Sequence, residues 1–415
     1  MHVARIKIEN VRGFGEGAEG VDLDLTDGGK RKLAGWTVFA GPNGSGKTTL
    51  LEAMAMTIAG ISIAPAGGPE WIHIGAGRAT AEPYLYACAD DDDAEVGHSS
   101  SMYWTPDGGG VPGPYLRGKV GYFVAGYGVH RRVVGGGEVF STGVSQYDGI
   151  GGLFREDAFL MESVTWLKDL DYRRLKGDPQ AGILLDHVIG ILEDALLPQG
   201  IKVLGIEPNG LRVRHKGIEL SLKSLSHGYQ TTTAFVMDLV MRMSRAFGDR
   251  FRVEHRDGRP VIPHSGVVLV DEMELHLHPS WQKKIGFWLK AHFPNVQFLV
   301  TTHSPFICQA ADTLVRLSIP GEGRPVAEIV DEDTYRRVVG GGADDAVVSD
   351  LFGLEFPHSD RAEQDREQLA QLEVKELDGT LPEGERPRLL ELQRRLPATP
   401  SIGVERVLRK IANDR

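Results

Sequence analysis

The chain has 415 residues, of which 41% are apolar and 25% charged, and its formal net charge is −11; this length predicts two or three domain-sized units. The acidic balance excludes a generally cationic nucleic-acid-binding surface, although it leaves room for a local basic groove. Cys88 and Cys308 lie far apart without a disulfide or metal-binding pattern. The amino terminus has no signal-peptide core, and no run approaches the ~18 apolar residues of a membrane span, so we expect a cytoplasmic protein with no membrane partner.

The first residues predict two half-buried strands and then a strand, a loop and a helix. Apolar and polar side chains alternate over residues 3–9 and again over residues 21–25. An apolar run at 36–40 predicts the strand that enters a glycine-rich loop at 41–49, and the following helix is expected over about 47–59.

The loop reads GPNGSGKTT and matches the pattern G-x-x-x-x-G-K-[ST] in full. Its backbone N–H groups are expected to surround phosphate oxygens, and the following helix directs its positive end to the same place. Lys47 can reach the β- and γ-phosphates, and the Thr48 hydroxyl can hold Mg²⁺. The predicted nucleotide-binding residues of the loop are Gly41, Pro42, Asn43, Gly44, Ser45, Gly46, Lys47, Thr48 and Thr49.

The middle of the chain shows weaker patterns and then a run of helices and strands. Residues 61–118 are rich in Gly, Pro and Ser, with one strand expected at 84–87, and residues 133–150 are again loop-like. Strands are expected at 120–125, 201–206, 211–214 and 218–222, and helices at 158–176, 183–197 and 226–245. Residues 249–263 are polar and predict a surface connection.

Two later strands end in polar side chains. The four apolar residues 267–270 predict a fully buried strand, and Asp271 and Glu272 follow it directly. Because ligands collect at the carboxyl ends of strands in an open α/β sheet, Asp271 is expected to hold Mg²⁺ and Glu272 to act as the general base toward water. The next buried strand, at 296–300, leads to His303, which is expected to contact the γ-phosphate or the water.

The helix expected at 226–245 begins with a Ser-x-Gly sequence. Ser226 is a good N-cap, and Gly228 leaves backbone N–H groups accessible at the positive end of the helix. By itself this pattern is typical of an ordinary helix cap.

In chain order, the phosphate loop, the Ser-x-Gly helix, the Asp-Glu strand and the His strand resemble an ABC/SMC-type AAA ATPase of the RecF-like group, over about residues 1–320. The segments that match this group are 8–14 (IENVRGF), 270–279 (VDEMELHLHP) and 298–305 (FLVTTHSP). The segment 225–230, LSHGYQ, departs from the transporter signature L-S-G-G-Q and is closer to the form found in the non-transporter members.

The resemblance implies an α/β P-loop NTPase fold of ABC/SMC-head type, with a mixed N-terminal sheet, a parallel core sheet, an insertion of helices and strands, and a C-terminal helical extension. It further implies that ATP and Mg²⁺ are bound. Asn10 and Arg12 are expected near the nucleotide. Ser226 and Gly228 are expected to contact the γ-phosphate held by a second subunit, so that a homodimer encloses two ATP molecules, with a higher oligomer also compatible.

A narrower similarity connects the chain to compact prokaryotic ATPases of anti-phage cassettes such as the Septu type. It rests on Tyr127-Gly128, Arg131-Arg132, Leu153-Phe154 and Trp166-Leu167. Gln146 is a candidate for the glutamine loop, although its surroundings differ from those in transporters. His276 and His278 form a His-x-His pair, but the resemblance places them in a dimer-facing loop rather than in a metal site.

We expect a composite ATPase head over residues 1–320, in which about 60–222 is a variable insertion and 223–320 contains the signature helix, the Asp-Glu strand and His303. No heptad run separates Lys47 from Ser226, so a long coiled-coil arm is not expected. Residues 321–415 are expected to form an extension for docking or oligomerisation. Its charged amphipathic helices are predicted at 363–377, 383–396 and 404–411.

The function predicted is an ATP-binding and ATP-hydrolysing switch that controls a separate effector, a nuclease or toxin, in anti-phage defence or DNA metabolism. The alternative is a DNA repair or recombination ATPase that acts directly on DNA ends or gaps. Candidate nucleic-acid-binding residues are Arg131, Arg132, Arg173, Arg174, Lys176, Arg212, Arg214 and Lys216. The motifs of this chain disfavour a transporter subunit. An intrinsic nuclease built on 331–333 or on Glu373 and Lys375 is disfavoured because the surrounding strand framework is missing.

Overall fold

A computed structural model describes residues 2–26, 29, 32–59, 69–86, 98–99, 102–105, 123–129, 150–154, 161–194, 201–207, 210–225, 227–321, 324–354 and 356–396. The chain divides into two compact units, Met1–Phe352 and Gly353–Arg415. Within the described part, no helix is both long enough and apolar enough to cross a bilayer.

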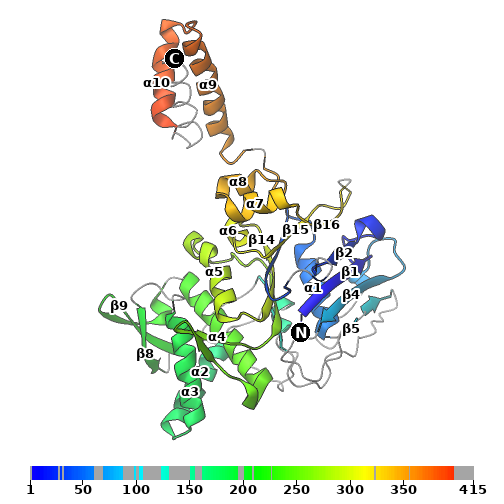
Figure 1. The fold of residues 1–415 in the computed structure, drawn as a ribbon, viewed down its shortest axis with the longest axis vertical. Coiled ribbons are helices and arrows are strands. Elements are labelled where there is room, and N and C mark those ends of the chain that lie inside the picture. The colour runs from blue at the N-terminus through cyan, green and yellow to red at the C-terminus, as the bar shows by residue number, and fades with distance from the viewer. Residues whose placement is uncertain are drawn as a thin grey trace. The chain divides into compact units, whose positions relative to one another are not determined.

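The first unit is built on a six-stranded sheet in the order β16-β15-β3-β14-β13-β7 (Figure 1). Its strands are β3 (Gly35–Ala40), β7 (Val124–Tyr127), β13 (Gly266–Val270), β14 (Val296–Thr302), β15 (Thr313–Leu317) and β16 (Ala327–Ile329). All are parallel except β16, which pairs antiparallel with β15. Every residue of β13 and β14 is buried, because layers cover both faces of the sheet and apolar β-branched residues pack well there.

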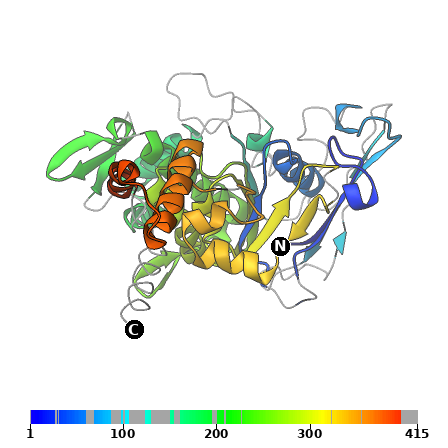
Figure 2. The same ribbon diagram turned by 90° about the horizontal axis from the view of Figure 1, so that it is seen from above.

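A second, antiparallel sheet lies against one face of this core. Its strands are β1 (His2–Glu9), β2 (Val21–Asp24), β4 (Ala79–Tyr86), β5 (His98–Ser99) and β6 (Met102–Trp104). Helix α1 (Lys47–Ala59) lies between the two sheets (Figure 2), and its apolar side chains between Leu50 and Ile58 belong to the apolar cluster that both sheets share. The buried amide of Gln297 in β14 bonds both the N–H and the C=O of Val3, at 2.7 and 2.9 Å, so it joins the two sheets directly.

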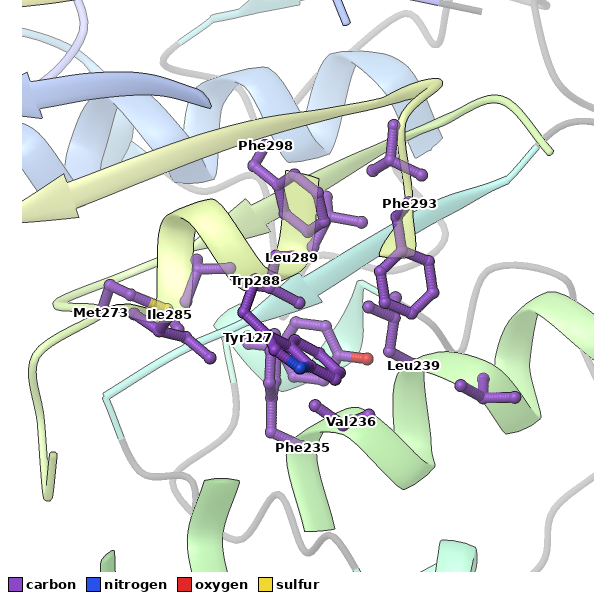
Figure 3. Packing of buried hydrophobic residues seen from close by; sticks show 14 of the residues in the cluster. Tyr127, Phe235, Val236, Leu239, Met273, Ile285, Trp288, Leu289, Phe293 and Phe298 are labelled. Atoms are coloured by element: carbon purple, nitrogen blue, oxygen red, sulfur yellow. The ribbon is translucent and has the colours of Figure 1, made fainter. Parts of the chain in front are cut away.

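The opposite face of the core sheet is covered by helices and a small sheet. These elements are α2 (Met161–Leu175), α3 (Pro179–Glu193), α4 (His227–Phe247), α5 (Pro279–His292), β8 (Ile201–Glu207), β9 (Gly210–His215) and β10 (Ile218–Ser221). Figure 3 shows Phe235 and Leu239 of α4 and Trp288 and Leu289 of α5 in one apolar cluster with Tyr127 of β7. The predicted α/β class with a parallel core is thus confirmed, while the pairings described in the N-terminal sheet are antiparallel rather than mixed.

A buried polar group holds α4 to β7 inside this cluster. The Tyr127 hydroxyl donates to Asp238 Oδ2 at 2.9 Å, and Arg242 one turn later forms a 2.5 Å ion pair with the same oxygen. Burial and the neighbouring Asp238 carboxylate raise the pKa of Tyr127 well above its usual value, so the hydroxyl stays protonated and remains a donor.

Two parts of the first unit differ from the sequence prediction. Residues 249–263, predicted as a surface connection, contain a hairpin of β11 (Glu254–Arg256) and β12 (Arg259–Val261). Its turn residues Asp257 and Gly258 have φ values of 51° and 78°, which is the geometry that Asp-Gly favours in a two-residue hairpin.

The second difference concerns the expected boundary at residue 320. Helices α7 (Glu332–Gly340) and α8 (Ala343–Val347) follow β16, and Val338 and Ala346 from these helices lie in the main apolar cluster. The structure therefore assigns these helices to the first unit, which extends to Phe352.

The short helical elements of the described chain are α6 (Pro305–Cys308) and the 3-10 turns Gly17–Glu19, Pro69–Trp71, Gly151–Leu153, Leu222–Ser224, Gly248–Arg250 and Glu383–Glu385, the last of which belongs to the second unit.

The second unit contains an antiparallel helical hairpin, α9 (Asp360–Leu377) and α10 (Arg386–Arg395), whose helices lie side by side in Figure 1. Leu369, Leu372, Leu389 and Leu392 form its buried centre. The helices predicted at 363–377 and 383–396 correspond to these two, whereas the helix predicted at 404–411 falls outside the described residues.

Candidate functional site

The carboxyl ends of β3, β13 and β14 meet at one edge of the core sheet, and we call this edge, with residues 41–49, 271–274 and 303, the nucleotide edge. Ala40 pairs with Thr302 and Val270 pairs with Val300. This register brings the start of the loop, the carboxylates and His303 to the same level, as the sequence predicted for strand ends of a parallel sheet.

The phosphate loop depends on glycine where the chain approaches the second sheet. Gly46 has φ of +87°, and a Cβ there would lie 2.5 Å from the ring of Phe14, which is fully buried. A side chain at this position would therefore be excluded both by the backbone conformation and by the aromatic ring. Ser45 beside it is completely buried, and its hydroxyl has no hydrogen-bond partner within the described residues.

Lys47 is held in place by the loop itself. Its Nζ donates to the carbonyl oxygens of Gly41 and Pro42, both at 2.9 Å, and only 7% of the residue is exposed. Burial lowers the pKa of Lys47, while the nearby carboxylates of Asp271 and Glu272 oppose that shift. The ammonium thus lies inside the loop that is predicted to surround phosphate oxygens, and it would contact a phosphate by exchanging these carbonyls for phosphate oxygens.

A hydrogen-bonded chain joins the loop to the ends of β13 and β14. Thr48 Oγ1 donates to Asp271 Oδ2 at 2.8 Å, and Thr301 Oγ1 donates to Asp271 Oδ1 at 2.5 Å. Thr301 Oγ1 in turn accepts the backbone N–H of Glu272 at 2.8 Å. One threonine hydroxyl thus orients both the predicted metal ligand and the predicted general base. Thr301 was not among the predicted site residues, although it lies within the matched segment 298–305.

Glu274 is a second residue that the prediction left without a role. Its carboxylate accepts the backbone N–H of His303 at 2.5 Å and the Thr302 hydroxyl at 2.7 Å. The turn after β13 therefore holds the end of β14 and the His303 backbone in position. Ser304 continues this connection, because its hydroxyl lies 2.6 Å from Oε1 of Gln282 in α5.

Arg12 lies in the segment that follows β1 of the second sheet. Its guanidinium lies 3.6 Å from the centre of the Trp71 ring and forms a 2.6 Å ion pair with Glu52 of α1. Trp71 is stacked on Trp104 with ring centres 5.7 Å apart. Burial raises the pKa of Glu52, and the Arg12 guanidinium opposes this shift. Neither Glu52 nor Trp71 was predicted as part of the site.

The amino end of α4 packs on the turn that follows Glu272 through Gly228, the glycine of the predicted Ser-x-Gly sequence. A Cβ on Gly228 would lie 2.5 Å from the carbonyl oxygen of His276, so glycine allows these two backbones to touch. Thr232 one turn later bonds the Gly228 carbonyl at 2.7 Å. Ser226 falls outside the described residues, and its expected contact with a second subunit stays a prediction.

Four residues of these segments that are not glycine have left-handed backbone conformations. They are Asn10, Arg12, Glu272 and His276, with φ values of 57°, 49°, 44° and 66°. Such conformations are costly for residues with a Cβ and cluster at functional sites. The only other described examples, Lys216 and Asp257, lie in hairpin turns.

The predicted basic residues are largely neutralised by acidic neighbours. Arg173 pairs with Asp178 and Arg174 with Asp171, each at 2.7 Å. Arg212 lies 3.4 Å from Glu207, and Arg214 pairs with Glu219 at 2.6 Å. Lys176 lies over the Tyr172 ring at 5.5 Å, and Lys216 forms a hairpin turn. Arg131, Arg132 and Gln146 fall outside the described residues.

The sequence fragments considered for a nuclease have structural roles. Asp331 caps α7 by accepting the N–H groups of Asp333 and Thr334, each at 2.9 Å. Glu373 accepts from Gln393 at 3.1 Å, and Lys375 pairs with Glu385 at 2.8 Å. These contacts build helix ends and the α9–α10 hairpin.

The two histidines of the His-x-His pair have separate places: His276 lies in the turn after Glu272, and His278 lies at the start of α5. His278 caps that helix, with its Nδ1 3.2 Å from the Ser280 backbone N. Across the described residues there is no group of three or more His, Cys, Asp and Glu side chains arranged to hold a metal ion.

Comparisons with known proteins agree with this description. A family model described as "AAA domain, putative AbiEii toxin, Type IV TA system" matches residues 153–309, and one described as "AAA domain" matches residues 5–76. The chain is 40% identical over 106 residues to "Retron Ec83 probable ATPase" of Escherichia coli, which is 26% of this chain and 18% of that protein. It is 33% identical over 103 residues to "Septu protein PtuA" of Bacillus thuringiensis, which is 24% of each chain. Each match thus spans about a quarter or less of the relative's length.

Among solved structures, the SMC head domain from Thermotoga maritima is 16% identical with a TM-score of 0.45, over 80% of this chain and 98% of that chain. A SmcHead structure bound to the C-winged helix domain of ScpA is 14% identical with a TM-score of 0.48, over 80% of this chain and 97% of that one. The two AAA-domain matches, together with the phosphate loop, confirm the predicted resemblance to AAA-domain ATPases. Over about a quarter of its length the chain is similar in sequence to a probable ATPase of a retron and to the Septu protein PtuA.

Proposed function

We propose that the chain binds Mg²⁺ and ATP at the nucleotide edge, hydrolyses the ATP, and uses it to join two copies head to tail. The observation that carries this proposal is the hydrogen-bonded chain from Thr48 through Asp271 and Thr301 to the Glu272 N–H. It places a hydroxyl and a carboxylate 2.8 Å apart beside a loop with a buried ammonium, and these are the oxygen ligands and the cation that a magnesium nucleotide needs.

Each residue then has a defined task. Thr48 Oγ1 and Asp271 would hold Mg²⁺, which supplies positive charge against the phosphates. Lys47 would exchange its loop carbonyls for phosphate oxygens, and His303 would contact the γ-phosphate or the water. Glu272, whose backbone Thr301 fixes, would take the proton from the attacking water. The Ser45 hydroxyl is buried and has no hydrogen-bond partner within the described residues, which supports a polar ligand such as a phosphate oxygen beside it.

The second subunit would contribute the signature segment 225–230, including Ser226 and Gly228, to the γ-phosphate. Support comes from the contact of Gly228 with the His276 carbonyl, because it ties this segment to the turn that begins at Glu272. Loss of the γ-phosphate would remove the bridge between the subunits and release them. The interface would thus have an associated state and a released state that the ligand selects, and such a two-state element can act as a switch.

We further propose that the switch controls a separate effector, a nuclease or toxin, in anti-phage defence or DNA metabolism. Similarity to a probable ATPase of a retron and to the Septu protein PtuA supports the defence role. The ion-paired arginines of α2 and β9 support control of a partner over direct action on DNA, because paired charges add little to the field that attracts phosphates. Direct action on DNA ends or gaps is the alternative.

The Glu272→Gln variant tests the chemistry. We expect it to bind ATP, to accumulate as an ATP-bound dimer and to release phosphate at a small fraction of the wild-type rate, because the amide cannot accept the proton. Size-exclusion chromatography with light scattering and a phosphate-release assay measure both effects. Glu332→Gln on the exposed surface of α7 is the matched control. Hydrolysis by Glu272→Gln at the wild-type rate would refute the assignment of the base.

The phosphate-release rate with and without double-stranded DNA, single-stranded DNA and RNA separates the two roles. A rate that nucleic acid leaves unchanged supports a switch gated by a protein partner. Stimulation by DNA ends or gaps supports the direct DNA-acting alternative.

A further inference from the structure

His303 lies just beyond the last paired residues of the core sheet. Strand β14 ends at Thr302, which pairs with Ala40, whereas the neighbouring β13 ends at Val270, which pairs with Val300. Neither neighbouring strand continues beside His303, so its backbone N–H needs an acceptor from outside the sheet. The Glu274 carboxylate supplies that acceptor at 2.5 Å.

Both oxygens of the Glu274 carboxylate hold the end of β14. Oε1 accepts the N–H of His303, and Oε2 accepts the hydroxyl of Thr302 at 2.7 Å. Thr302 Oγ1 in turn accepts the N–H of Ser304 at 2.9 Å. Hydrogen bonds to an ionised carboxylate are stronger than those between neutral groups. One side chain therefore fixes the backbone of His303 directly and, through Thr302, the residue that follows it.

A second set of hydrogen bonds leads from Ser304 back to the turn that contains Glu274. The Ser304 hydroxyl donates to Oε1 of Gln282 in α5 at 2.6 Å, and Nε2 of Gln282 donates to the Leu277 carbonyl at 2.9 Å. The N–H of Leu277 then donates to the Glu274 carbonyl at 2.9 Å. These bonds form a closed ring, and a satisfied polar network of this kind is rigid. The His303 backbone and the turn 274–277 therefore form one rigid group.

The same rigid group contacts the amino end of α4 at two places. The His276 carbonyl faces Gly228, where a Cβ would lie only 2.5 Å from the oxygen. The ring of Tyr229 meets the ring of Trp281 edge-on, with centres 6.3 Å apart. His276 lies within the turn, and Trp281 directly precedes Gln282 of the ring of hydrogen bonds. Close-packed contacts transmit displacement, so a shift of the His303 backbone would reach α4.

We propose that Glu274 is a positioning residue that ties His303 to the turn 274–277, and that this turn couples the γ-phosphate contact of His303 to the amino end of α4. The proposal rests on the proposed function, in which His303 contacts the γ-phosphate or the water and the segment 225–230 contacts the second subunit. The two hydrogen bonds of Glu274 go to the end of β14 rather than to the phosphate loop. A chain with ATP bound would thereby adjust the segment that it presents to the nucleotide of the second copy.

The first test is hydrogen exchange of the full-length chain without nucleotide, measured by mass spectrometry. In Glu274→Ala we expect faster exchange at 302–304 and also at 231–234, the first amides that bond within α4. Glu274→Gln should keep much of the protection, because its amide oxygen can still accept the His303 N–H. Glu193→Ala is the matched control, since Glu193 accepts the N–H of Val203 at 2.7 Å. Unchanged exchange at 231–234 in Glu274→Ala overturns the coupling to α4.

The second test is a double-mutant cycle of phosphate release with Glu274→Ala and His303→Ala. Glu274→Ala should lower kcat by up to about 10²-fold with little change in KM, because it misplaces His303 without touching the loop. The double variant should be no slower than His303→Ala alone, since Glu274 acts through His303. Thr302→Val removes one of the two bonds and should lie between wild type and Glu274→Ala, which keeps the test available if Glu274→Ala does not fold. Losses that multiply in the double variant overturn the positioning role.

The two tests separate this proposal from the proposed function. A wild-type chain that releases no phosphate refutes the proposed hydrolysis, and the exchange measurement, which needs no nucleotide, then decides the link between Glu274, His303 and α4 by itself. If the wild-type chain hydrolyses ATP and Glu274→Ala does so with the same kcat, the proposed hydrolysis stands and the positioning role of Glu274 fails.

Discussion

The phosphate loop and the amino end of α4 both depend on a glycine, but the two glycines act differently. Gly46 adopts φ of +87° and lets the loop pass the Phe14 ring, which shapes a surface open to a ligand. Gly228 is helical and lets two segments of the same chain touch, because its Cα faces the His276 carbonyl. One glycine prepares a binding surface, and the other connects the proposed signature helix to the turn after Glu272.

This difference separates binding from communication between sites. Residues of the loop should affect nucleotide binding and turnover directly. Residues at the contact between α4 and the Glu272–His276 turn should leave binding intact and alter the association that binding drives. Substitutions in the loop and substitutions at the α4 contact can therefore test whether binding and association depend on different residues.

The largest effect is expected at Lys47. Its ammonium is buried and held by two loop carbonyls, and the loss of one preorganised charged contact to the transferred group reduces turnover by about 10²–10³-fold. Lys47→Ala should therefore lose most ATPase activity and also bind a fluorescent ATP analogue weakly. Lys284→Ala, exposed on α5, serves as the control. Turnover that persists in Lys47→Ala would place the chemistry elsewhere.

Thr301→Val should produce the next largest effect. The change keeps the shape of a fully buried side chain but removes the hydroxyl shared by Asp271 and the Glu272 N–H. A buried donor left unpaired costs about 1–3 kcal/mol, and misplaced catalytic groups reduce turnover by up to about 10²-fold.

The control for Thr301 is Thr313→Val, a second buried threonine in a parallel strand of the same sheet. Steady-state phosphate release and denaturant unfolding of both variants give the comparison. Equal behaviour of the two threonine variants would mean that the hydroxyl of Thr301 does not organise the site.

Gly228→Ala tests the other side of the comparison. The new Cβ would lie 2.5 Å from the His276 carbonyl oxygen, so α4 must shift, and overpacking of this kind costs about 1–3 kcal/mol. Nucleotide binding should remain, while ATP-dependent association should weaken by about tenfold or more.

A matched helical glycine is available in α3. A Cβ on Gly190 meets its nearest atom, Cγ of Pro260, at 3.9 Å, so Gly190→Ala should be neutral or gain up to about 1 kcal/mol from helix propensity. Analytical ultracentrifugation with and without ATP separates the two variants. Normal ATP-dependent association of Gly228→Ala would contradict the proposed connection.

The sequence predicts those parts of the site that follow one another in the chain, but it does not predict the contacts between distant segments. The loop 41–49 and the carboxylates at 271–272 are determined by local pattern, since a strand, a turn and a helix succeed one another in the chain. The hold of Glu274 on His303 and the ion pair of Arg12 with Glu52 join residues 29 and 40 positions apart. No periodicity reports such contacts, because they arise only when β14 and α1 pack beside their neighbours.

The left-handed conformations at Glu272 and His276 were also beyond prediction, because neither residue type requires positive φ and the surrounding packing imposes it. In contrast, the hairpin at 254–261 was missed although Asp257-Gly258 is a strong turn signal. Polar composition outweighed that signal, since both strands are short and neither shows a long alternation.

The smallest expected effect concerns pH and Glu52. Burial raises the pKa of this carboxyl above its ordinary value of 4.5, and Arg12 opposes the shift. The folded chain therefore binds the proton at a higher pH than the unfolded chain does. As pH falls from neutral toward the raised pKa of Glu52, protonation removes the free-energy cost of burying the carboxylate. Wild-type stability should therefore increase relative to Glu52→Gln over this range, and Arg12→Gln should enlarge the increase by removing the opposing charge. Denaturant unfolding at several pH values measures it, and parallel curves for wild type and Glu52→Gln would show that Glu52 is not held in this way.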